Sequence, residues 1–139
     1  QQTTTNEERT ENPMPEFETA DFAGVAARYI ESWNERDARA RSKAIERVWA
    51  EDARYTDPLV DSEGREAIAA TIAEAQARFP GFVFRLAGPV DGHHNLCRFA
   101  WEFGPEGAEA PIAGSDVALV DPDGTLKRVV GFLDRVPAA

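Results

Sequence analysis

The stretch FVFRLAGPVDGHHNLCRFAWEFGPEGAEAPIAGSDVALVDPDGTLKRVVGFL, residues 82–133, decides the fold of this 139-residue chain. Its alternation of apolar and polar residues predicts strands at 82–87, 95–103, 112–120 and 126–133. Clusters of glycine, proline and aspartate separate the four runs. Such clusters favour tight turns, because glycine adopts positive φ and proline presets the first turn residue. The second half of the chain is therefore predicted to form an antiparallel sheet.

Upstream of this stretch, the apolar residues recur with a helical period. This period predicts helices at 21–35, 38–50 and 65–78, with a short strand at 53–57 between the second and third. Helices that precede a run of antiparallel strands are typical of the α+β class. A bent sheet covered by only a few helices leaves a cleft at its open end, which is a natural ligand site.

Composition and charge narrow the range of partners. The formal net charge is −10, which argues against nucleic acid because phosphate groups would be repelled. Cys97 is the only cysteine, so an internal disulfide and a four-cysteine zinc site are both excluded. No apolar run approaches the ~20 residues needed to cross a membrane. A small molecule or another protein is the partner that this composition favours.

The first twenty residues differ in composition from the rest of the chain. Residues 1–20 contain five Glu, one Arg and two Pro and little apolar surface, so we expect a flexible acidic tail. Residues 21–139 are expected to form one domain. The start lacks a basic segment followed by an apolar one, the mark of a secretory signal, and we therefore expect a cytoplasmic protein.

Three local sequences, in this order, carry a family resemblance. They are RYIESWNERD at 28–37, ARYTDP at 53–58, and GSD at 114–116 leading to DG at 123–124. Together they resemble the NTF2-like superfamily, whose bacterial members include SnoaL-like polyketide cyclases and ketosteroid isomerases. The resemblance implies a cone in which a strongly curved, mostly antiparallel, mixed sheet and three helices enclose a pocket.

The resemblance also implies a set of catalytic residues. Ketosteroid isomerases use a tyrosine of the first helix and an aspartate of the sheet as an oxyanion hole, and the aspartate of an Asp-Pro pair as the base. Tyr29, Asp116 and Asp57 occupy the matching positions here. The implied activity is that of a cofactor-free, metal-free isomerase or cyclase. It would remove a proton beside the carbonyl group of a hydrophobic, steroid-like or polyketide-like substrate.

The same comparison suggests how the pocket binds its ligand. Bulky aromatic residues near the expected site are candidate walls for a hydrophobic small molecule: Phe22, Trp33, Tyr55, Phe99, Trp101 and Phe132. We also expect a homodimer, because three helices leave one face of so long a sheet uncovered and that face carries alternating Val and Leu.

Simpler interpretations of the three candidate catalytic residues remain open. Tyr29 on an amphipathic helix can be a core tyrosine, and Asp57 before Pro58 can form an Asx-type turn. Asp116 needs partners if its strand face is buried, but on a solvated face it is an ordinary surface carboxylate. Two other functions therefore stand beside the enzyme: a non-catalytic binder of small molecules, and a dimeric interaction module with a vestigial pocket.

Overall fold

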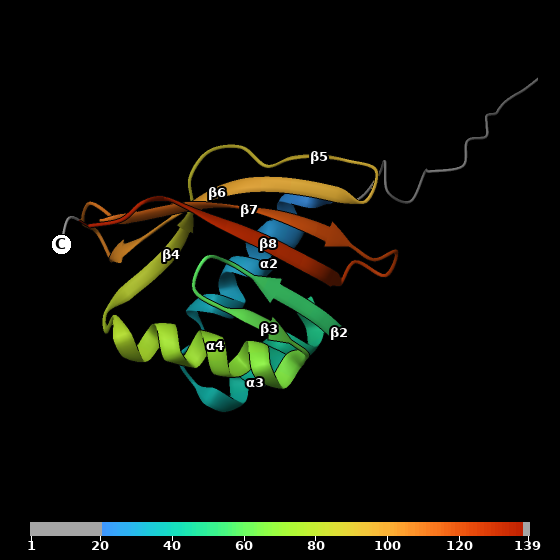
Figure 1. Ribbon diagram of the computed structural model, residues 1–139, viewed down its shortest axis with the longest axis horizontal. Helices are drawn as coiled ribbons and strands as arrows, with labels where there is room; N and C mark the ends of the chain where they lie inside the picture. Colours follow the sequence, from blue (N-terminus) through green and yellow to red (C-terminus); the bar gives the residue numbers. More distant parts are fainter. Residues whose placement is uncertain (1–20, 138–139) are drawn as a thin grey trace, which may run out of the picture.

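The computed structural model describes residues 21–137, which form three helices and one sheet (Figure 1). The helices are α2 (Phe22–Asn34), α3 (Ala38–Val48) and α4 (Arg65–Arg78). The strands are β2 (Trp49–Thr56), β3 (Asp61–Glu63), β4 (Phe82–Leu86), β5 (Asp91–His93), β6 (Leu96–Pro105), β7 (Ile112–Val120) and β8 (Leu126–Arg135). The predicted α+β class is confirmed. The predicted tail at 1–20 lies outside the described residues.

The sheet is mixed and curved. Its strand order is β3-β2-β8-β7-β6-β4, with β5 paired to β6. The β2–β8 pair is parallel and the other pairs are antiparallel. In Figure 1, β6, β7 and β8 form an upper layer, β2 and β4 lie lower, and α3 and α4 lie beneath the layer. The concave side of the sheet therefore faces the helices.

The main difference from the prediction lies at Trp49. The second helix was expected to reach residue 50, but α3 ends at Val48 and β2 begins at Trp49. The Trp49 side chain is fully buried, and its backbone pairs with Leu126 of β8. Tertiary packing therefore outweighs the local helical pattern. The short strands β3 and β5 were not predicted, because three residues are too few to show a period.

Polar side chains fix where α2 begins and ends. The Asp21 carboxylate accepts a hydrogen bond from the Gly24 N–H at 2.9 Å and caps the first turn. At the other end, the Asn34 amide donates to the Phe84 carbonyl and accepts from the Phe84 N–H, both at 2.8 Å. These two hydrogen bonds to β4 hold the last turn of α2, and Trp33 with it, against the sheet.

An aromatic core positions the middle of α2. The Tyr29 ring packs against Phe99 of β6 and Trp49 of β2, with centroid separations of 5.4 Å and 5.5 Å. Each such pair contributes about 0.5–1.5 kcal/mol beyond the burial of its area. The packing sets the Tyr29 hydroxyl on the inner side of the sheet, where β7 passes.

Between residues 21 and 137, no helix is long and apolar enough to cross a membrane. The expected cytoplasmic location stays a prediction.

Candidate active site

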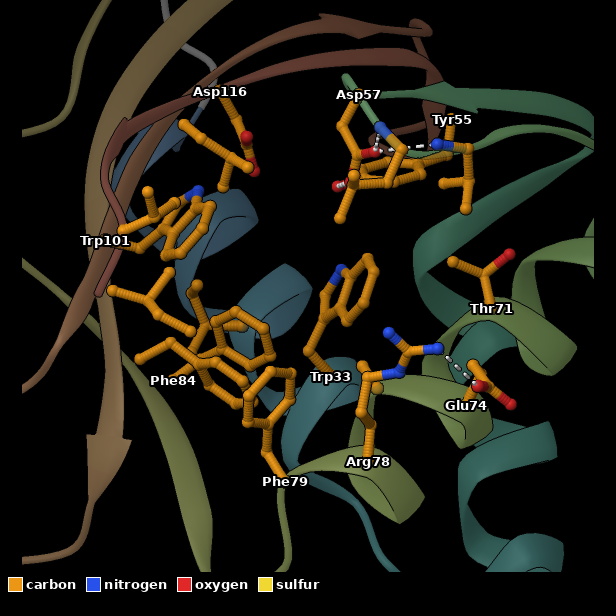
Figure 2. Close-up of a pocket in the computed structure, with 18 of the residues that line it drawn as sticks. Trp33, Tyr55, Asp57, Thr71, Glu74, Arg78, Phe79, Phe84, Trp101 and Asp116 are labelled. Atoms are coloured by element: carbon orange, nitrogen blue, oxygen red, sulfur yellow. Dashed lines mark hydrogen bonds and ion pairs between the residues drawn. The ribbon is translucent and has the colours of Figure 1, made fainter. Parts of the chain in front are cut away.

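A cavity of about 550 Å³ opens between the inner face of the sheet and helices α2 and α4 (Figure 2). This volume falls within the range of sites that bind small molecules. Most of its lining is apolar: Ile30, Trp33, Leu59, Val60, Ala75, Phe79, Phe84, Trp101, Phe103, Ile112, Leu133, Val136 and Pro137. The polar lining residues are few: Tyr29, Tyr55, Asp57, Thr71, Glu74, Arg78 and Asp116.

Asp116 is a buried carboxyl in the middle of β7, with an exposed fraction of only 2%. The Tyr29 hydroxyl donates to its Oδ2 atom at 2.7 Å. Its Oδ1 atom is also buried and has no hydrogen-bond partner among the described residues. An unpartnered buried polar atom is costly, so its presence in a cavity wall marks a place where a ligand can bind.

The environment of Asp116 shifts its protonation. Burial is the main cause, and the charges of Asp57 and Asp134 act in the same direction. The nearby donor groups of Tyr29 and Trp101 oppose the shift, and the pKa of Asp116 rises to about 6. Burial, together with the charge of Asp116, also raises the pKa of Tyr29 well above its usual value, so the phenol keeps its proton.

Asp57 follows the end of β2 and is held by three donors. The backbone N–H groups of Leu59 and Val60 donate to its Oδ1 atom at 2.8 Å and 3.0 Å. The Tyr55 hydroxyl donates to its Oδ2 atom at 2.6 Å. The Asx-type turn is therefore present, and the carboxylate lines the cavity as well. Each carboxylate oxygen has two lone pairs, so Oδ2 keeps one for a ligand.

Gly131 of β8 lies close to both aspartates. It pairs with Asp116 across the β7–β8 ladder. A Cβ atom at this position would lie 2.6 Å from Asp116 Oδ1 and 3.5 Å from Asp57 Cβ. Any side chain here would clash with this oxygen, so glycine lets the Asp116 carboxyl lie close against the backbone of β8.

Two tryptophans form walls next to these groups. The Trp33 ring lies between Tyr55 and Phe84, at centroid separations of 5.2 Å and 5.3 Å. Trp101 packs edge-on against Phe84 at 5.3 Å. Figure 2 shows both indole rings facing the open space below the two acids.

The structure therefore gathers the three predicted catalytic residues and half of the predicted walls. Tyr29, Asp57 and Asp116 line one cavity, as do Trp33, Tyr55 and Trp101. Their functional roles stay predictions.

The other three predicted walls lie outside the cavity lining, which corrects that part of the prediction. Phe132 points to the outer side of the sheet and is 56% exposed, because its strand neighbour Gly131 faces inward. Phe99 is buried in the core behind the ring of Tyr29. Phe22, in the first turn of α2, packs over Gly92 of β5.

Helix α4 contributes lining residues that the sequence reasoning missed. Thr71, Glu74 and Arg78 lie along the cavity beside Ala75. Their spacing of three and four residues puts them near one face of the helix, but polar residues on a helix are usually assigned to solvent. Two hydroxyl groups brace this helix, since Ser62 Oγ and Thr71 Oγ1 lie 2.6 Å apart.

The acidic and histidine side chains do not form a metal site in the described part of the chain. Across residues 21–137, no group of three or more His, Cys, Asp or Glu side chains is placed to hold a metal ion. His93 ends β5 and His94 begins the turn after it; both side chains are exposed, and their Nδ1 atoms lie 3.1 Å apart.

The fold and this cavity define a protein of the NTF2-like class. Within that class the chain belongs to the SnoaL-like family, because the model of the SnoaL-like domain matches residues 26–129. The resemblance inferred from the three local sequences is therefore confirmed. No relative was found among curated proteins.

Solved structures support the same assignment. A candidate isomerase of the SnoaL-like family from Agrobacterium tumefaciens is 41% identical, with a TM-score of 0.78 over 81% of this chain and 97% of that one. A candidate SnoaL-like polyketide cyclase from Jannaschia is 13% identical, with a TM-score of 0.65 over 91% and 92%. A candidate polyketide cyclase from Sinorhizobium meliloti is 16% identical, with a TM-score of 0.62 over 78% and 93%. At such low identity, the last two support the fold alone.

Proposed function

We propose that this SnoaL-like protein is a cofactor-free isomerase or cyclase that removes a proton beside the carbonyl group of a hydrophobic substrate. The observation that carries the proposal is the difference between the two carboxyl groups near Gly131. Asp57 accepts three hydrogen bonds, whereas Asp116 is buried and has one oxygen without a partner. Two acids in different environments can take opposite roles in proton transfer. The apolar lining favours a steroid-like or polyketide-like compound.

In the proposed reaction, Asp57 is the base. Its Oδ2 atom takes a proton from the carbon next to the carbonyl, and the electrons of that C–H bond move toward the carbonyl oxygen. Protonated Asp116 donates from Oδ1 to this oxygen. The Tyr29 hydroxyl, which bonds Asp116 Oδ2, supports that carboxyl or turns to the same oxygen. Donors fixed in an apolar site stabilise developing charge more strongly than they would in water.

Two outcomes follow from the enolate. In an isomerase, Asp57 returns its proton to a different carbon of the conjugated system. In a cyclase, the enolate carbon forms a bond to a second carbonyl carbon of the same molecule, and the proton goes to the new alkoxide. Both routes conserve atoms and electrons and need no other reactant.

The proposal is tested by the exchange of substrate α-protons with deuterated water. We expect the wild-type protein to accelerate deuterium incorporation into hydrophobic ketones, measured by NMR. Asp57→Asn should lower that rate by about 10²–10⁴-fold, the usual contribution of a general base. Its fold should persist, because the amide oxygen can still accept from the N–H groups of Leu59 and Val60.

Asp61→Asn is the matched control. Asp61 is an exposed carboxylate of β3 that pairs with Arg54, away from the cavity lining, and its replacement should leave exchange unchanged. Unchanged exchange in Asp57→Asn would remove Asp57 as the base.

One observation favours a non-catalytic alternative. Asp57 already accepts three hydrogen bonds, which is also what a purely structural turn carboxylate would do. The protein would then bind a hydrophobic molecule in the same cavity without changing it. Ligand binding detected through Trp33 and Trp101 fluorescence, without any α-proton exchange, would establish this alternative.

The partner that we propose for the outer face of the sheet is a second copy of the chain. Val117 and Phe132 are exposed on this face, and their strand neighbours point into the protein. Val130, which pairs with Val117, lies on the same face as Phe132, and a contiguous apolar patch of this kind favours a protein contact. Sedimentation at micromolar concentration should give a dimer that Phe132→Asp dissociates. A wild-type monomer would contradict the proposal.

A further inference from the structure

The cationic side chain of the cavity lies apart from the two aspartates. Asp57 and Asp116 lie together across Gly131, whereas Arg78 extends from the last turn of α4. Figure 2 shows Arg78 and Glu74 on the opposite side of the Trp33 ring from the two acids. Arg78 is the only cationic residue of the cavity lining within the described part of the chain. The cavity therefore has two acids at one end and an Arg78–Glu74 ion pair at the other.

The Arg78 guanidinium makes only one weak contact with the described part of the chain. Its recorded contact among residues 21–137 is an ion pair with Glu74, at 3.6 Å and with 68% of the Arg78 side chain exposed. A well-formed charge-assisted hydrogen bond is about 2.7–2.9 Å long, and an exposed pair of this kind contributes little stability. By contrast, Arg54 makes two short bonds to Asp61, at 2.9 Å and 2.7 Å. Arg78 can therefore exchange its partner for a ligand anion at little cost.

Two apolar residues of the cavity lining are largely exposed to solvent. Leu59 and Val136 both line the cavity, yet they are 79% and 56% exposed. Exposed apolar side chains in a cavity lining offer surface that a lipophilic ligand can cover. A cation in the same lining fits a ligand whose apolar body ends in an anionic group.

Building on the proposed function, we propose that the substrate is an amphipathic carboxylic acid whose carboxylate binds Arg78 at the cavity mouth. Its apolar body lies along the aromatic walls, and its reacting carbonyl reaches Asp116 and Asp57. The reverse orientation would place a carboxylate beside two acidic groups, which charge repulsion disfavours. A planar carboxylate matches the guanidinium fork, which can form two parallel hydrogen bonds with it.

The test uses naphthyl ketones whose acyl chains, of increasing length, end in a carboxylate, each paired with its methyl ester. Binding is measured by quenching of tryptophan fluorescence. For at least one chain length, the acid should bind the wild-type protein about three- to tenfold more tightly than its ester, in line with a partly exposed charge-assisted contact. This preference should shrink as salt is added, because a charge contact at the surface is screened, while ester binding should change little.

Variants separate a direct contact from a structural effect. Arg78→Gln should abolish the preference for the acid and leave ester binding unchanged, whereas Arg78→Lys should keep part of it. Glu74→Gln should strengthen acid binding by removing the competing carboxylate. Arg47→Gln is the matched control, since Arg47 is an exposed arginine of α3 outside the cavity lining, and it should behave as wild type.

Two results would overturn the inference: equal binding of acid and ester at every chain length, or equal loss of both in Arg78→Gln. These results concern binding alone, so they are independent of turnover. A protein that prefers the acid but exchanges no α-protons would refute the proposed catalysis and leave the Arg78 contact standing.

Discussion

Asp57 and Asp116 are the same residue type in one cavity, yet their surroundings differ. Asp57 lies in a loop at the end of β2, where two backbone N–H groups and a phenol donate to it. Asp116 lies in the middle of a central strand, buried, with one oxygen bonded to Tyr29 and the other unpartnered. The contrast shows that position in the sheet, rather than residue type, divides proton acceptor from proton donor in the proposed reaction.

The largest effect on stability is expected from the titration of Asp116, and it tests whether this carboxyl group is buried. Its pKa in the folded protein is about 6, above the ordinary value of 3.8, so the folded state binds this proton more tightly than the unfolded state. The stability gained from that proton is complete below about pH 4 and is lost as the pH rises through about 6. Relative to Asp116→Asn, the wild-type protein should therefore lose about 2–3 kcal/mol of unfolding free energy between about pH 4 and pH 7.

Urea unfolding of both proteins across this pH range measures the difference. Asp61→Asn serves as the control, because the Arg54 hydrogen bond lowers the pKa of Asp61 to about 2 and its contribution is already complete above pH 4. If the difference in unfolding free energy between the wild-type protein and Asp116→Asn stayed constant with pH, Asp116 would be solvated like a surface group.

A smaller effect separates the two tyrosines that donate to these acids. Tyr29→Phe leaves Asp116 Oδ2 buried without a donor, which should cost about 1–3 kcal/mol of unfolding free energy. Tyr55→Phe removes one of three donors to a half-buried carboxylate, which should cost about 0.5–1.5 kcal/mol. Thermal or urea unfolding of the two variants gives the comparison. Equal losses, or a larger loss in Tyr55→Phe, would contradict the difference in burial.

Much of the fold could be predicted from the sequence, because its signals are local. Helix α4 has the predicted bounds, since glycine precedes it and Pro80-Gly81 follows it. Strand β7 also has the predicted bounds, because alternation and flanking turns mark both ends. The boundary at Trp49 could not be predicted, since it depends on contact with a strand more than seventy residues later.

The site was harder to predict, because each side chain's direction depends on strand pairing. Phe132 was expected in the cavity, but the pairing of Gly131 with Asp116 turns Phe132 outward. Arg78 was overlooked because a charged residue on an amphipathic helix usually faces water. Its place at the cavity mouth depends on how α4 packs against the sheet, which local periodicity does not contain.

The pH dependence of α-proton exchange tests the central claim most directly, because it separates a donor from a base at Asp116. If Asp116 donates a proton to the substrate oxygen, the wild-type rate should fall as the pH rises above about 6, by up to about tenfold per pH unit. In Asp116→Asn, whose amide remains a donor at every pH, this fall should disappear. A wild-type rate that instead rises through the same pH range would mean that Asp116 accepts the proton, and would contradict the proposed division of roles.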